Sequence, residues 1–194
     1  MDQKLIAEII EHLLNSLNKE TYEHSIRVSI VASWFIQQSG LIEEKKKKEI
    51  VILGALFHDV GKIGFEKFLQ KKHLTSSEKQ KIRLHSEWGE DNLVCISKEI
   101  RKVVRHHHER WDGKGYPDGL KEEEIPLPAR IVSLIDAFDV MIKGRSYKKP
   151  KSLEKAIEEL KKGAGSQFDP VLTERFVSFI KSSYELPIFY NLPP

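Results

Sequence analysis

The chain has 194 residues, of which 40% are hydrophobic and 31% are charged, so it can bury one core beneath a well-solvated surface. Its formal net charge of +3 is small and gives no reason to expect a nucleic-acid polymer as partner. The single cysteine, Cys95, excludes an internal disulfide and a cysteine-based zinc site, and it is compatible with a reducing compartment.

The longest uncharged apolar stretch covers residues 50–57, far fewer than the roughly 20 residues that a membrane-spanning helix needs. The N-terminus alternates charged and apolar residues and has no apolar core of the signal-peptide type. The sequence therefore predicts a cytoplasmic protein without a membrane segment.

The first half of the chain has helical periodicity. Leucines and isoleucines three and four residues apart predict an amphipathic helix over residues 3–17. Asn18 is a suitable N-cap for a second helix, which Gly40 ends. A third helix is expected over residues 43–60, and its apolar second half, IVILGALF, is typical of a central, buried helix.

The second half is also helical, apart from a long loop. Thr75 and Glu78 form a capping box that opens a helical region to about residue 96, and Ser97 caps the next helix, to about His108. The prolines and glycines after position 110 predict an ordered loop. Further helices are expected over 128–143, 152–162 and 169–182. We therefore predict an all-α fold with a single domain over residues 1–194, in which 1–17 form an N-terminal helix and 183–194 an apolar tail.

Several polar residues stand where apolar ones would be expected. His58 and Asp59 directly follow IVILGALF, and Asp136 lies within the apolar segment RIVSLIDAFDVM. For His58 alone, a helix end that reaches solvent explains the pattern as well as a metal site does. The other candidates are Glu20 and His24, which share a helical face, His85, and the run His106, His107 and His108.

Imidazoles and carboxylates without thiolates suit Fe, Mn, Zn or Ni. A carboxylate such as Asp59 can bridge two ions, and ions about 3.5–4 Å apart form a two-metal clamp for phosphoester chemistry. The residues therefore indicate a metal centre built from separate helices.

The spacing of His24, His58-Asp59 and Asp136 resembles the H…HD…D pattern of the HD superfamily of metal-dependent phosphohydrolases. Three further segments resemble the HD-GYP subfamily, the bacterial cyclic-di-GMP phosphodiesterases: HDVGKIG (58–64), HHERWDGKGYPDGL (107–120) and GSQFDP (165–170). The resemblance covers about residues 20–180 and implies an HD-domain-like helical bundle with an ordered GYP loop.

The resemblance implies two or three divalent ions, Fe or Mn, with Asp59 as the bridging ligand and Glu20 holding a third ion. The implied metal ligands are Glu20, His24, His58, Asp59, His85, His107, His108 and Asp136. Lys62 corresponds to a lysine that contacts the scissile phosphate, so Asp59 and Lys62 are the implied catalytic residues.

Arg145 and Lys148 correspond to a basic pair that binds the substrate phosphates. The segment IKGRSY (142–147) departs from the family pattern there, because it lacks the proline and the acidic residue that usually flank the arginine. Tyr116 and Trp111 are candidates for stacking on a guanine, and Trp111 could equally anchor its loop. His106 is expected to support a neighbouring ligand or to face solvent.

The implied activity is hydrolysis of cyclic di-GMP to pGpG, and possibly to GMP, by attack of a metal-bridging hydroxide. Two alternatives stay open: hydrolysis of another cyclic dinucleotide or a nucleoside phosphate, and a non-catalytic module that binds cyclic di-GMP or a partner protein. A homodimer or a signalling-protein partner is compatible with either.

Overall fold

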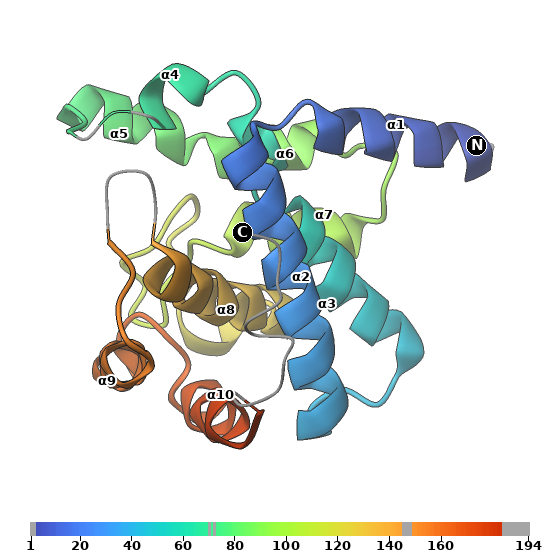
Figure 1. The fold of residues 1–194 in the computed structure, drawn as a ribbon. Helices are drawn as coiled ribbons and strands as arrows, with labels where there is room; N and C mark the ends of the chain where they lie inside the picture. Colours follow the sequence, from blue (N-terminus) through green and yellow to red (C-terminus); the bar gives the residue numbers. More distant parts are fainter. Residues whose placement is uncertain (1–2, 70, 72, 145–148, 184–194) are drawn as a thin grey trace.

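The computed structural model describes residues 3–69, 71, 73–144 and 149–183, and Figure 1 shows their arrangement. All regular structure within these ranges is helical, apart from one isolated bridge between Ala164 and Phe168, which confirms the all-α prediction. No helix of the described residues is long and apolar enough to cross a bilayer.

The described residues form ten α-helices and two short 3-10 helices. In chain order these are α1 (Gln3–Asn15), α2 (Lys19–Ser39), α3 (Lys45–Phe57), the 3-10 helix η1 (Val60–Lys62), α4 (Glu66–Leu69), α5 (Ser76–Arg83), α6 (His85–Asn92), α7 (Lys98–His106), the 3-10 helix η2 (Glu122–Glu124), α8 (Leu127–Lys143), α9 (Leu153–Gly163) and α10 (Pro170–Ser183).

The predicted helix caps are confirmed. The Asn18 side chain accepts a hydrogen bond from the Thr21 backbone N–H at the start of α2, and Gly40 ends that helix in the left-handed conformation with φ 62°. Thr75 and Glu78 form the reciprocal capping box of α5. The Ser97 side chain accepts from the Ile100 N–H and begins α7.

Two predicted boundaries were wrong, and both errors fall beside the predicted metal ligands. The third helix ends at Phe57 rather than at residue 60, because the chain turns at His58 and Asp59 into η1. The region after the capping box is two helices, α5 and α6, which meet at Leu84. Both breaks place a histidine at a helix end, where its ring can face the interior. The short helix α4 was not predicted.

The main core forms where α2 and α3 pack side by side and α8 and α10 pack against them (Figure 1). Phe35 on α2 contacts Phe176 on α10 edge to face, with ring centroids 5.1 Å apart. A second apolar cluster joins the end of α3 to α6 and α7 through Phe57, Leu93 and Val104. These two clusters fix the ends of the helices that carry the predicted ligands.

Candidate metal centre

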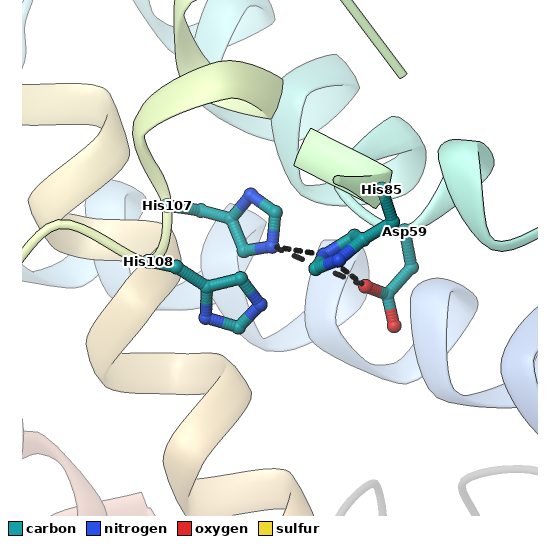
Figure 2. A group of neighbouring side chains, drawn as sticks. All are labelled: Asp59, His85, His107 and His108. Carbon is teal, nitrogen blue, oxygen red and sulfur yellow. Dashed lines mark hydrogen bonds and ion pairs between the residues drawn. The ribbon is translucent and has the colours of Figure 1, made fainter. Parts of the chain in front are cut away.

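The structure brings together every predicted metal ligand except Glu20, in two neighbouring groups. One group holds Asp59, His85, His107 and His108, which Figure 2 shows. The other group holds His24, His58 and Asp136. Within each group the potential ligand atoms lie within 4.8 Å of one another. The side chains come from α2, the turn after α3, α6, the turn after α7, and α8.

Asp59 lies between the two groups and points one oxygen at each. Its Oδ1 lies 3.5 Å from His85 Nε2 and 3.9 Å from His107 Nε2. Its Oδ2 lies 3.5 Å from His58 Nε2 and 3.9 Å from His24 Nε2. This arrangement is compatible with the bridging role that the resemblance implies for Asp59.

Three of the histidines are oriented by the backbone. The Nδ1 atoms of His58, His85 and His107 donate to the carbonyl oxygens of Ala55, Ile82 and Val104, at 2.7, 2.6 and 2.7 Å. Each acceptor lies three residues before its histidine, at a helix end or break. Because a carbonyl oxygen can only accept, Nδ1 carries the proton and Nε2 keeps its lone pair.

The Nε2 atoms face each other in pairs. His85 Nε2 lies 3.3 Å from His107 Nε2, and His58 Nε2 lies 3.2 Å from His24 Nε2. Nitrogen ligands about 2.1 Å from one divalent ion lie roughly 3.0 to 3.4 Å apart at angles of about 90 to 110°. Asp59 Oδ1 is also buried without a hydrogen-bond partner among the described residues. Both observations fit divalent cations.

The imidazoles beside Asp59 Oδ1 are held neutral, as metal ligands must be. Burial lowers the pKa of His85 to about 4, and the positive charge of Lys62 adds to this effect. Burial and the neighbouring imidazoles hold the pKa values of His107 and His108 well below the usual range. Lone pairs are therefore available at neutral pH.

His24 has a different environment. Burial alone would lower its pKa, but hydrogen bonds with Asp136 and Asp139 raise it to about 9. Its Nε2 lies 3.0 Å from Asp136 Oδ1 and its Nδ1 lies 2.7 Å from Asp139 Oδ2. A cation bound beside Asp136 would therefore have to displace a proton from His24.

Comparisons with known proteins agree with this geometry. A family model described as "HD domain" matches residues 8–172. The chain belongs to the HD-domain family. The resemblance inferred from the motifs is thereby confirmed at the level of the family.

Named relatives of this HD domain include a "Cyclic di-GMP phosphodiesterase" of Thermotoga maritima, 35% identical over 91% of the chain and 49% of that protein. A "3'3'-cGAMP-specific phosphodiesterase 2" of Vibrio cholerae is 31% identical over 86% of the chain and 33% of that protein. The chain thus spans half or less of these two relatives. A solved cyclic GMP-AMP phosphodiesterase structure from V. cholerae superposes with a TM-score of 0.69 at 21% identity, over 96% of the chain and 52% of that structure, which supports the fold.

Lys62 is a buried cation that contacts Asp59 in this HD domain. Its Nζ donates to Asp59 Oδ2 at 2.6 Å, from the turn that directly follows Asp59. Burial opposes the charge of Asp59, but Lys62 and His58 keep the pKa of this carboxyl well below its usual value. Lys62 therefore contacts the same Asp59 oxygen that faces His58 and His24.

Glu20 lies outside both ligand groups. It is exposed at the start of α2, where it lines a pocket together with His24, Asp59 and Lys62. The same pocket extends to Gly144, the last residue before the predicted phosphate-binding segment. Arg145 and Lys148 lie outside the described residues. The pocket therefore provides an approach to the Asp59 Oδ2 side of the centre.

The two aromatic candidates of the GYP loop have different surroundings. The Tyr116 ring stacks on the predicted ligand His108, with centroids 4.8 Å apart, and the Arg83 guanidinium lies 5.0 Å from the Tyr116 centroid. Trp111 lies under the Arg130 guanidinium, and its backbone N–H donates to the Gln167 carbonyl. These contacts favour loop anchoring for Trp111 and leave Tyr116 beside the metal ligands.

The sequence reasoning missed three residues that support the centre. Asp139 accepts from His24, and Arg27 holds Asp139. Each lies three residues after a predicted ligand on the same helix, a spacing that could have identified them. Glu109 is buried, and its Oε1 accepts the backbone N–H groups of Asp118 and Gly119, which ties the GYP loop to the end of α7. His106 contacts Asp118 at 2.9 Å and lies outside both groups, which agrees with a supporting role.

Gly61 allows η1 to pack directly on α6. A Cβ at this position would overlap the His85 carbonyl oxygen and lie 2.6 Å from the Gly89 backbone nitrogen. Both obstacles are backbone atoms, which cannot move aside as a flexible side chain can. The missing side chain therefore brings the Asp59 turn within reach of His85.

We expect Gly61→Ala to push η1 away from α6, to lower the free energy of unfolding by about 1–3 kcal/mol and to weaken metal binding. Denaturant unfolding of the metal-free protein and the metal content after reconstitution measure the two effects. Gly40→Ala is the control: it places alanine at φ 62° at the end of α2, with open space around it. It should cost about 1 kcal/mol and leave the metal content unchanged. Normal metal content in Gly61→Ala would contradict the packing argument.

Proposed function

We propose that the chain is a metal-dependent phosphodiesterase that hydrolyses cyclic di-GMP to pGpG with two or three divalent ions, Fe or Mn, two of them held on either side of Asp59. The observation that carries this proposal is the pair of facing imidazole groups that share one carboxylate. The name of the T. maritima relative supports the substrate. When bound, such ions supply an activated water and stabilise charge on a phosphate.

The chain's own residues have distinct tasks in this proposal. Asp59 would hold both ions. The carbonyl acceptors of His58, His85 and His107 hold these rings with Nε2 toward the ions, so little reorganisation accompanies binding. Tyr116 braces the His108 ring from the GYP loop.

Lys62 is the residue that we assign to the substrate. Lys62 lines the pocket that also reaches Asp59, and its ammonium group can stabilise charge that accumulates on a non-bridging phosphate oxygen there. We propose Arg145 and Lys148 as further phosphate contacts, since they follow Gly144, which lines the same pocket. Glu20 lines this pocket too, and we propose it as the ligand of a third ion.

The decisive experiment offers substrates in competition. Protein purified without oxygen and loaded with Fe²⁺ or Mn²⁺ is given equal concentrations of cyclic di-GMP and 3'3'-cGAMP, and the products are separated by chromatography. We expect cyclic di-GMP to be consumed faster and pGpG to accumulate. Slower conversion to GMP would reveal a second step.

A second candidate substrate is 3'3'-cGAMP, favoured by the name of the V. cholerae relative at 31% identity. If 3'3'-cGAMP were consumed faster in the same competition, it would be the preferred substrate in place of cyclic di-GMP. A fully metallated protein that binds cyclic di-GMP and turns over neither nucleotide would instead be a binding module.

A further inference from the structure

We infer that Asp139, clamped by Arg27, is the positioning residue that holds the ion on the His24, His58 and Asp136 side. The two ion positions are therefore not equivalent: among the histidines whose Nδ1 partner the described residues show, only His24 donates to a side chain. The inference rests on the metal centre of the proposed function and adds a residue pair that binds neither ion nor substrate.

The need for Asp139 follows from where His24 lies in its helix. His58, His85 and His107 lie at helix ends or breaks, where the carbonyl three residues earlier is available to Nδ1. His24 lies inside α2 (Lys19–Ser39), where those carbonyls accept the N–H groups of the helix itself. The His24 ring therefore needs an acceptor from another element, and Asp139 on α8 supplies it at 2.7 Å.

Arg27 fixes the Asp139 carboxylate in a single orientation. Its Nε donates to Asp139 Oδ1 at 2.8 Å and its Nη2 donates to Oδ2 at 2.9 Å, a two-pronged contact that the planar guanidinium favours. Asp139 Oδ2 accepts from both Arg27 and His24. The side chains of His24, Arg27 and Asp139 are all buried. Water therefore cannot readily satisfy a polar group that loses its partner, and the loss destabilises the site.

This chain of contacts acts on His24 in two ways. With Nδ1 donating to Asp139, the ring can present a lone pair at Nε2 beside His58 Nε2 and Asp136. The negative charge behind the ring also makes Nε2 a stronger ligand. On the Asp59 Oδ1 side, the Nδ1 atoms of His85 and His107 donate to backbone carbonyls instead.

The test is Asp139→Asn, which keeps the shape of the side chain and removes its charge. Mn²⁺ titration followed by calorimetry gives the number and affinity of bound ions, and elemental analysis after desalting gives the ions retained. We expect one ion to bind as in the unchanged protein and the other to bind about 10–100-fold more weakly. Arg27→Lys, which can hold one carboxylate oxygen at a time, should give a smaller loss at the same ion.

Asp169→Asn is the matched control, because Asp169 is also a buried carboxylate paired with an arginine, Arg130, at 2.6 Å, and it contacts none of the predicted ligands. It should keep both ions. Full retention of both ions in Asp139→Asn would overturn the inference, and so would equal weakening of both ions, which a general loss of packing would cause. If the protein without substitutions bound neither Mn²⁺ nor Fe²⁺, the metal centre and the proposed function would both be overturned.

Discussion

Asp59→Asn is expected to abolish binding of at least one ion and to lower turnover by roughly 10³-fold or more, the largest effect of any single substitution in the centre. The carboxylate faces His85 and His107 with one oxygen and His58 and His24 with the other. An amide offers one weakly donating oxygen and no negative charge, so it cannot serve two cations. Both ions should therefore be weakened together, unlike in Asp139→Asn.

The same substitution tests the electrostatic balance of the metal-free protein. Lys62 is buried and donates to Asp59 at 2.6 Å, so Asp59→Asn leaves a buried ammonium without its paired charge. We expect the free energy of unfolding to fall by about 3 kcal/mol. Circular dichroism during denaturant titration measures this loss, and elemental analysis of the folded variant measures the ions.

Asp118→Asn is the control for the metal content of Asp59→Asn. Asp118 also pairs with basic groups, Arg105 at 2.7 Å and His106 at 2.9 Å, and it lies outside both ligand groups. It should retain the full number of ions. If folded Asp59→Asn bound two ions with unchanged affinity, a bridging role for Asp59 would have to be given up.

The sequence predicted those parts of the fold that local physics determines. The caps Asn18, Thr75 and Ser97 were correct because each bond involves residues no more than three positions apart. The breaks at His58 and Leu84 were missed because tertiary packing decides them. Val60 packs in the second apolar cluster, and Gly61 lies against α6, which local propensity does not reveal.

In the candidate site, too, the sequence predicted what residue chemistry and motifs indicate and missed what tertiary contacts decide. The grouping of imidazoles and acids could be predicted because such residues are unusual beside apolar segments such as IVILGALF, and the resemblance to the HD-GYP pattern then implied the individual ligands. Asp139 and Arg27 were missed because their role depends on a contact between α2 and α8, more than 100 residues apart along the chain. The predicted helix between Asn18 and Gly40 already placed His24 inside a helix, but it did not show which element supplies the acceptor for Nδ1.

Lys62 stands apart from the other residues of the centre because its charge has the same sign as the ions. Its Nζ donates to Asp59 Oδ2 at 2.6 Å. We also propose this oxygen as a ligand of one of the cations. A bound cation would compete for this oxygen and release Lys62 toward the pocket that Glu20 and Gly144 line. Lys62 would thus become available to a substrate phosphate when the metal centre is loaded.

Lys62→Gln should therefore lower turnover by roughly 10²- to 10³-fold, as expected when a donor to the transition-state oxygen is lost. It should leave Mn²⁺ affinity equal or higher, because a competing positive charge is gone. This combination is the opposite of the one expected for Asp59→Asn and Asp139→Asn, in which lower metal affinity accompanies lower turnover. Saturating metal during the kinetic assay separates the two effects.

Lys71→Gln is the control, because Lys71 is an exposed lysine paired with Glu78 at 2.6 Å away from the ligand groups. Its loss should change neither turnover nor metal affinity. If Lys62→Gln lost metal, Lys62 would be a structural partner of Asp59. If it kept normal turnover with metal bound, the substrate phosphate would have to be stabilised by the ions and by other side chains. Only low turnover of Lys62→Gln with full metal content would show that the Lys62 ammonium group acts on the substrate.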